Sequence, residues 1–188
     1  MKQHILPAIK LTAVTIIFFM GIYTLFVWAV AQAAPNKGEG ETISVNNKVV
    51  GYKLEGQKFS DDKYFWSRPS AAGYNAAASS GSNKGTSNPD YLKDVQSKID
   101  TFLVHNPTVK KEEIPSDMVT YSGSGLDPDI SVEAANIQIE RIAATRKIDK
   151  QKVQELVNKH IEKSFAGLFG TSRINVLQLN IEIGRAHV

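Results

Sequence analysis

Cysteine is absent from this chain of 188 residues, and histidine occurs only four times. The absence of cysteine excludes disulfide bonds, thiolate zinc sites and cysteine nucleophiles, so the fold must be stabilised by packing. Two histidines, His4 and His187, lie close to the ends of the chain. The other two, His105 and His160, have no companion motif, and we expect them at the surface of helix ends rather than acting as catalytic bases.

Clustered positive charge is also lacking. The formal net charge at pH 7 is +3, and Lys2 and Lys10 supply two of these three charges. The rest of the chain, from Ala34 onward, is therefore close to neutral. Binding to nucleic acid depends on an excess of basic residues that neutralise phosphates, so we expect no nucleic-acid partner.

The motifs of nucleophilic and phosphate-binding sites are incomplete. Residues Ser122–Gly125 contain Gly-Ser-Gly but lack the first glycine of the G-x-S-x-G elbow of serine hydrolases. Residues Gly81–Thr86 reverse the Lys-Gly order of a phosphate loop. The backbone N–H groups of Ser122–Gly125 would suit an anion, although a tight turn before a helix explains the same residues. The sequence therefore predicts no catalytic residue.

Four aspartates are candidate metal ligands: Asp61, Asp62, Asp127 and Asp129. The order Asp-Pro-Asp-Ile-Ser that begins at Asp127 is typical of a turn leading into a helix N-cap. No histidine or cysteine reinforces these aspartates, and the spacing of an EF-hand is absent. The sequence therefore predicts no metal site.

Charged residues are missing altogether from Leu11 to Ala34. A helix of these 24 residues would be about 36 Å long, enough to cross a hydrocarbon layer of roughly 30 Å. We expect a transmembrane helix at 11–34, preceded by a cytoplasmic tail at 1–10. Lys2 and Lys10 precede the span and Lys37 follows it, so the positive-inside rule places the N-terminus in the cytoplasm and the domain outside it. We expect this membrane to be a cell inner membrane.

A cleaved signal peptide is the alternative interpretation of this segment. Ala29–Ala31 and Ala31–Ala33 both offer small-x-small cleavage sites. The apolar core of a signal peptide runs only about 7 to 15 residues, however, so the length here favours an uncleaved anchor.

One face of the predicted transmembrane helix carries small residues. Ala13, Ile17, Gly21 and Thr24 fall on one helical stripe, which would let another transmembrane helix approach closely. The same residues would also be compatible with a face that contacts lipid.

The remaining pattern predicts an α+β domain at 42–181, joined to the span by a polar linker at 35–41. Alternating residues over Thr42–Leu54, with a turn at Asn46-Asn47, indicate a hairpin. Apolar residues spaced three and four apart indicate helices that begin after Asn88, at Ser131 and near Asp149.

Two segments after the hairpin are predicted without helix. A long run of small residues from Ser70 to Asn88 reads as a loop, and Arg173–Ile181 reads as a strand with one slip at Val176-Leu177. Residues 182–188, EIGRAHV, look like translated sequencing adapter, so we expect an artefact there and leave them out of the predicted fold.

Longer strings of residues resemble one known family, the C chain of the bacterial potassium-transporting P-type ATPase (KdpC). The resemblance covers the anchor and the domain. The strings that carry it lie in the domain and are, in order, Tyr64–Ala71, Gly73–Asn75, Ser79–Asn83, Ser87–Pro89, Val119–Pro128, Ile130-Ser131, Ala134-Ala135, Gln138, Arg141, Ala143 and Arg173–Leu177. Members of the family often have histidine where Asp129 stands and proline where Val132 and Glu140 stand.

This resemblance implies a non-catalytic accessory subunit of a high-affinity potassium uptake pump. Its partners would be the potassium-pore subunit and the ATP-hydrolysing subunit of the same complex. The family has also been assigned a chaperone-like role that raises the ATP affinity of the ATPase subunit, and ATP would then be a shared ligand. At the matching positions of this chain, the nucleotide contacts would be Ser122, Gly123, Ser124, Gly125 and Gln138.

Two arguments oppose direct contact with ATP. ATP is cytoplasmic, whereas the charge asymmetry around the span places the domain outside. Gln138 also fits a plain polar face of the second predicted helix, with Arg141 three residues further on.

Overall fold

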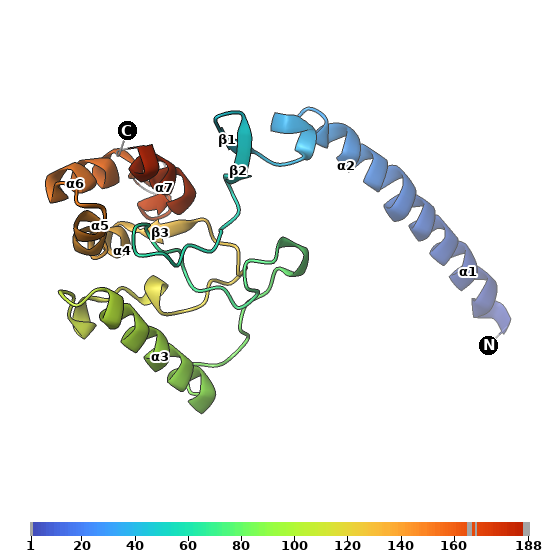
Figure 1. The fold of residues 1–188 in the computed structure, drawn as a ribbon. Coiled ribbons are helices and arrows are strands. Elements are labelled where there is room, and N and C mark those ends of the chain that lie inside the picture. The colour runs from blue at the N-terminus through green and yellow to red at the C-terminus, as the bar shows by residue number, and fades with distance from the viewer. Residues whose placement is uncertain (1, 165–166, 168, 186–188) are drawn as a thin grey trace. The chain divides into compact units, whose positions relative to one another are not determined.

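The chain divides into two compact units, Met1–Glu41 and Thr42–Val188. The computed structural model describes residues 2–164, 167 and 169–185. A long apolar helix makes up most of the first unit, and the second combines helices with two small antiparallel sheets (Figure 1). The predicted α+β class, with one apolar N-terminal helix, is confirmed.

The first unit is a continuous helical rod. It consists of α1 (Lys2–Ile16), a π-helical stretch (Ile17–Tyr23) and α2 (Thr24–Ala31). Within it, His4–Ala31 is long and apolar enough to cross a membrane. The hydroxyl of Thr24 donates to the carbonyl oxygen of Phe19 at 2.9 Å, so this polar group is satisfied within the helix, as a hydrocarbon environment requires.

The linker after this rod folds back on itself. Residues Asn36 and Lys37 have φ values of 54° and Gly38 has φ 79°, so three successive residues are left-handed. Asn36 closes the turn by donating from its side chain to the carbonyl oxygen of Gly40. A Cβ placed on Gly38 would lie 3.1 Å from the Cβ of Ala31, the last residue of α2. The chain therefore returns to the end of α2.

The second unit begins with the predicted hairpin, made by β1 (Thr42–Val45) and β2 (Lys48–Tyr52). Asn46 and Asn47 have φ values of 51° and 60°. A type I′ turn needs positive φ at both central residues, and asparagine tolerates this conformation better than most residues. The predicted hairpin and its turn are confirmed.

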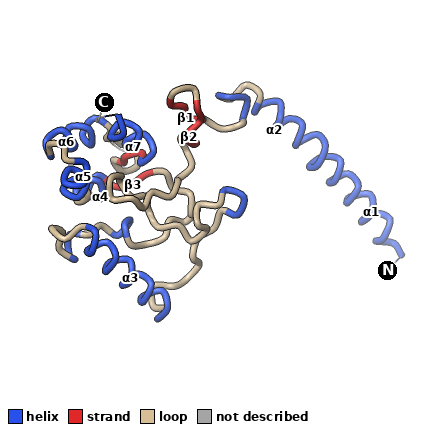
Figure 2. Tube along the Cα trace, in the orientation of Figure 1, coloured by secondary structure: helices blue, strands red, loops and turns tan. Residues whose placement is uncertain are grey.

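The core forms around a second antiparallel pair, β3 (Asp129–Ser131) and β4 (Arg173–Asn175), in which Ile130 pairs with Ile174. Both isoleucines are buried. The helices that pack with this sheet or with one another are α4 (Val132–Asn136), α5 (Ile139–Arg146), α6 (Lys150–Lys159) and α7 (Val176–Arg185). Figure 2 shows how short the strands are beside these helices.

The predicted helix starts are confirmed. Helix α3 (Pro89–His105) begins where the side chain of Asn88 accepts from the N–H groups of Asp90 and Tyr91. Ser131 caps α4 and Asp149 caps α6 in the same way. The second predicted helix is interrupted at Ile137 and Gln138, which separates α4 from α5.

The prediction of a strand over Arg173–Ile181 is wrong beyond Asn175. The side chain of Asn175 accepts from the N–H of Gln178 at 3.0 Å, and a helix starts at Val176. Val176, Leu179 and Ile183 are buried at helical spacing. Residues 182–185 continue α7, whereas 186–188 lie outside the described residues. The prediction that 182–188 are an artefact stays a prediction.

The run of small residues from Ser70 to Asn88 is a loop, apart from one 3-10 turn at Ala76–Ala78. Tyr74 anchors it, because its hydroxyl donates to the carbonyl oxygen of Arg68 at 2.6 Å. Burial raises the pKa of Tyr74 to about 12. Tyr74 also has φ 61°, a left-handed conformation that its anchored side chain helps to hold.

Candidate functional site

The segment Asp61–Ser67 has no regular secondary structure and is held in place by side chains from other elements. Gln138, between α4 and α5, is fully buried. Its Oε1 accepts from the N–H of Trp66 and from Nη2 of Arg141, both at 2.7 Å. Its Nε2 donates to the carbonyl oxygen of Ala134 at 3.0 Å. Both polar atoms of Gln138 therefore have partners inside the protein.

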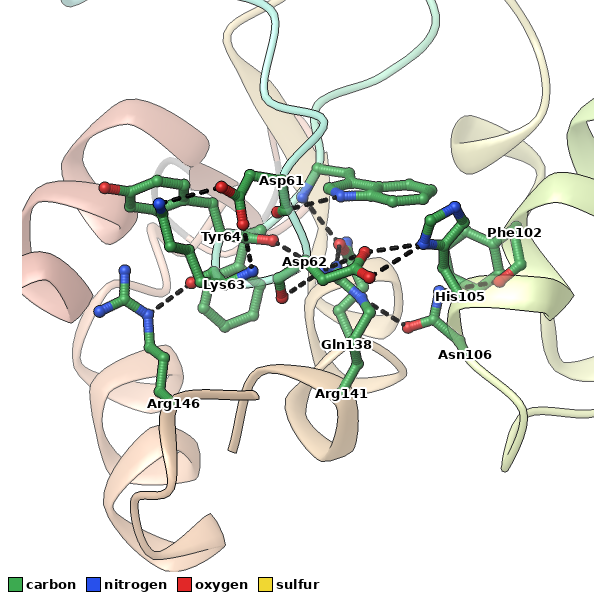
Figure 3. Close-up of polar contacts among 12 residues, drawn as sticks. Asp61, Asp62, Lys63, Tyr64, Phe102, His105, Asn106, Gln138, Arg141 and Arg146 are labelled. Atoms are coloured by element: carbon green, nitrogen blue, oxygen red, sulfur yellow. Dashed lines mark hydrogen bonds and ion pairs between the residues drawn. The ribbon is translucent and has the colours of Figure 1, made fainter. Parts of the chain in front are cut away.

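Arg141, in the first turn of α5, is the centre of this network (Figure 3). Its Nη1 donates to the carbonyl oxygens of Asp62 at 2.6 Å and Tyr64 at 3.1 Å, and its Nε donates to Oδ1 of Asn106 at 3.0 Å. Burial lowers the pKa of Arg141 to about 10, and the carboxylate of Asp62, 3.6 Å away, partly opposes this effect. The guanidinium therefore remains charged at neutral pH.

Two more side chains hold the same segment from other directions. Asn180 of α7 accepts from the N–H of Phe65 at 2.8 Å and donates to its carbonyl oxygen at 2.9 Å. Arg146, at the end of α5, donates to the carbonyl oxygen of Lys63. We call the set Gln138, Arg141, Arg146 and Asn180 the backbone clamp, because all four bind main-chain atoms of Asp61–Ser67.

The ring of Trp66 lies between the clamp and α3. The guanidinium carbon of Arg141 is 4.8 Å from the ring centroid, within the range of a cation–π contact. The ring of His105 is 4.9 Å away, and its Nδ1 lies 2.9 Å from Oδ1 of Asp62. His105 lies at the end of α3, as predicted, but it is fixed by two neighbours rather than free at the surface.

An apolar pocket of about 320 Å³ opens beside Trp66. Its walls include Phe59, Phe102 and Met118, and its polar lining includes Lys98 and His105. Lys98 is already paired with Asp94 of its own helix. The pocket is thus mainly an apolar surface next to the clamp, and neither Gln138 nor Ser122–Gly125 lines it.

The turn Ser122–Gly125, predicted to contact a nucleotide, packs on residues other than those of the backbone clamp. Ser122 is buried, and its N–H donates to the carbonyl oxygen of Pro69 at 3.1 Å. Gly123 and Ser124 are exposed at the tip. Gly125 has φ 69°, and a Cβ there would lie 2.8 Å from the carbonyl oxygen of Ser80. The turn is therefore packed tightly on the small-residue loop.

The predicted site residues lie in two different parts of the structure. Ser122, Gly123, Ser124 and Gly125 form one turn, whereas Gln138 belongs to the backbone clamp. The alternative in which Gln138 and Arg141 form a solvated polar face is wrong, because Gln138 is 0% exposed and Arg141 only 7%. Contact of any of these residues with a nucleotide stays a prediction.

The two aspartates near the turn form ion pairs. Asp127 Oδ2 lies 2.8 Å from Nη1 of Arg68, and Asp127 Oδ1 accepts from the N–H of Asp129 at 3.0 Å, as expected for a turn. Asp129 pairs across β3 and β4 with Arg173, its Oδ2 2.9 Å from Nε. Burial raises the pKa of the Asp129 carboxyl. The aspartate at position 129, where the family often has histidine, is therefore paired with Arg173 in this chain.

Sequence reasoning missed Asn106 and Asn180 as members of the polar network. Asn106 directly follows α3 as its C-cap, and Asn180 lies in the segment predicted as a strand. A buried asparagine cannot be recognised from spacing alone, because its partner is the backbone of a distant segment: Asn180 and Phe65 are separated by 115 positions.

Comparison with known proteins identifies the family of this chain. Residues 5–185 match the family model described as "K+-transporting ATPase, c chain". A protein named potassium-transporting ATPase KdpC subunit in Flavobacterium psychrophilum is 56% identical over 181 residues, which cover 96% of this chain and 97% of that protein.

More distant bacteria have similar proteins. The KdpC subunit of Bacteroides fragilis (strain YCH46) is 48% identical over 184 residues, with 96% of both chains covered. That of Bacillus cereus is 43% identical over 185 residues, with 97% of this chain and 96% of the relative covered. A family match over residues 5–185 covers nearly the whole chain, and the chain therefore belongs to the KdpC family of potassium-transporting ATPase subunits.

Proposed function

We propose that this chain is a non-catalytic accessory subunit that stabilises an ATP-driven potassium uptake pump. In this proposal the helix His4–Ala31 packs on the potassium-pore subunit within the membrane. The domain from Thr42 onward then lies on the extracytoplasmic side, beside the entrance for potassium. The ATP-hydrolysing subunit completes the complex.

The observation that carries this proposal is that the side chains of the backbone clamp are already hydrogen-bonded to other parts of the protein. Gln138 and Arg141 are polar residues at positions that match the family, and both are buried with their polar atoms bonded to neighbours. A ligand could reach Gln138 only if Trp66 and Arg141 gave up these bonds. Such a network favours a rigid module that assembles with partners over one that binds and turns over a substrate.

The distribution of charge supports an outside location. Lys10 precedes the apolar run, and no further lysine follows until Lys37, so the basic side of the helix is its N-terminal side. The proposal therefore places the N-terminus in the cytoplasm and the domain away from cytoplasmic ATP.

A second candidate function is that of a chaperone that raises the ATP affinity of the ATPase subunit in a transient ternary complex. The exposed tip at Gly123 and Ser124 favours it, since a glycine-containing turn can offer backbone N–H groups to a phosphate. This candidate requires the turn to face the cytoplasm.

Accessibility of Ser124 separates the two candidates. Because the natural sequence lacks cysteine, Ser124→Cys creates a single thiol that a membrane-impermeant maleimide can label in whole cells. We expect labelling from outside. The matched control is His4→Cys, at the N-terminal end of the apolar helix, which should react only after permeabilisation. The reverse pattern would exclude the proposed topology and support the chaperone.

Assembly tests the stabilising role directly. The pore and ATPase subunits should fail to co-purify as an intact pump from cells that lack this chain. A pump that assembles and imports potassium normally without it would refute the proposal.

A further inference from the structure

The β1–β2 hairpin carries an unusual group of exposed apolar side chains. Val49 and Tyr52 of β2 are 56% and 41% exposed, and Leu54, two residues beyond β2, is 70% exposed; we call these three the hairpin patch. Val50, at 37%, lines a pocket with Leu177 and Ile181 of the domain and is left out of the patch. Gly51, between them, faces the domain, because a Cβ there would meet Gln57 and Leu177. The hairpin thus packs on the domain at Gly51 and leaves large apolar groups in contact with solvent.

Polar contacts tie this hairpin and the residues after it to the rest of the domain. Gln57 Nε2 donates to the carbonyl oxygen of Val50 at 3.3 Å, and Asn175 donates to that of Lys53 at 2.8 Å. A two-stranded hairpin is only marginally stable alone, and a cover over its apolar side chains would stabilise it further.

The covalent chain keeps the hairpin close to the end of the apolar helix. Gly38 lies against Ala31, the last residue of α2, and only four Cα-to-Cα steps lead from Gly38 to Thr42, where β1 begins. Four steps span at most about 15 Å. This limit holds for any orientation of the two units.

The same limit places the start of the hairpin beside the membrane surface. The apolar window His4–Ala31 is about 42 Å long as a helix, which exceeds a hydrocarbon layer of roughly 30 Å. Its end therefore reaches the headgroup layer, and Thr42 lies within about 15 Å of Gly38, which packs against that end.

We propose that the hairpin patch rests in the headgroup layer of the bilayer, as a second membrane contact of this chain. The inference depends on the proposed membrane anchorage of the helix. Tyr52 suits this layer, since aromatic rings with a polar end are enriched there. Near the hairpin, three exposed lysines (Lys37, Lys48, Lys58) lie with two exposed glutamates (Glu39, Glu41), so the net charge is small. Apolar burial therefore drives the contact, and salt has little influence on it.

Fluorescence quenching by lipid-borne nitroxides tests this contact. Single cysteines are placed in the full chain at Leu54, at Val104 and at Met20, labelled with a small fluorophore, and reconstituted in phosphatidylcholine nanodiscs. Val104, on α3, is the matched control because it is 76% exposed in the same unit. Met20, which is 74% exposed in the helix, reports on the anchorage itself.

We expect headgroup nitroxides to quench the Leu54→Cys probe several-fold more than the Val104→Cys probe, at low and high salt alike. Equal and weak quenching at both positions, with strong quenching of Met20→Cys by nitroxides on the acyl chains, would overturn the patch contact and leave the anchorage intact. Absence of quenching at Met20→Cys would overturn the anchorage as well. If Leu54→Cys is shielded only in the assembled pump, its cover is a protein and the lipid contact is wrong.

Discussion

At the scale of single residues, Arg141 joins several separate segments of the domain through one side chain. One guanidinium, almost fully buried, bonds the main chain of Asp62 and Tyr64, the side chain of Asn106 and the ring of Trp66. A planar group with several donors can satisfy these acceptors at once, whereas the compact ammonium of lysine cannot. The geometry of the guanidinium therefore matters as much as its charge.

Replacing Arg141 by lysine should destabilise the domain by about 3 kcal/mol, because carbonyl and amide oxygens would be left buried without donors. The free energy of unfolding can be followed by the fluorescence of Trp66 in denaturant, with Trp28→Phe as the background. Glu140→Ala, at an exposed position of the same helix, is the control and should change stability by less than about 0.5 kcal/mol. Equal stability of the two variants would contradict the assigned role of Arg141.

Tyr74 should make stability depend on alkaline pH. Burial raises the pKa of its phenol from the usual 10.0 to about 12, so the folded state holds this proton more tightly than the unfolded state. The stabilisation is complete below pH 10.0 and is lost as pH rises toward 12. A tyrosinate absorbance titration should show one phenol that ionises late, and Tyr74→Phe should remove that step. A titration that Tyr74→Phe leaves unchanged would show that the late phenol is another one.

The residue scale also marks a limit of sequence reasoning. Gln138 and Arg141 lie three positions apart, a spacing that fits a solvated face as well as a buried one. What distinguishes the two is the backbone of Asp61–Ser67, which approaches α5 from far away in the chain. Local pattern contains no information about that approach, so the inward orientation of both side chains could not be predicted.

At the scale of elements, α7 shows how a boundary assumption alters a predicted structure. Without residues 182–188, Ile174 and Val176 alternate with polar residues, and after one slip Leu177, Leu179 and Ile181 alternate again. Ile183 extends Val176 and Leu179 into helical spacing, and it is completely buried. The helix starts and the hairpin turn, by contrast, were predictable, because asparagine, serine and aspartate caps and the Asn-Asn turn are local signals.

Two neighbouring substitutions in α7 should have opposite effects. Ile183→Ala should cost about 3 kcal/mol, since it removes a buried side chain from a packed core. Gly184→Ala should stabilise the domain by roughly 0.5 to 1 kcal/mol, because a Cβ there meets nothing within 4 Å and alanine favours a helix. Thermal unfolding followed by circular dichroism measures both. If neither substitution changes stability, residues 183 and 184 do not form part of α7 in solution.

At the scale of the whole molecule, the membrane helix and the domain are expected to serve the same assembly through different surfaces. Gly21 lies on the small-residue stripe with Ala13, Ile17 and Thr24, and a Cβ placed there would meet nothing within 4 Å. The helix itself therefore accepts a larger residue at this position, and only a neighbouring helix would be obstructed.

Gly21→Leu should accordingly leave membrane insertion unchanged but reduce co-purification with the pore subunit several-fold. Phe18→Leu, at an exposed position of the same helical stretch, is the control and should not affect recovery of the complex. Unimpaired assembly of Gly21→Leu would mean that the stripe faces lipid.

The backbone clamp has a consequence for how this protein tolerates mutation. Its four side chains grip main-chain atoms of Asp61–Ser67, and every residue type offers those same atoms apart from the missing N–H of proline. Changes at Lys63 should therefore be absorbed easily, whereas Gln138 and Arg141 have no equivalent substitutes. A systematic survey of variants should find that Asp61–Ser67 tolerates many substitutions, whereas the four residues of the backbone clamp tolerate few.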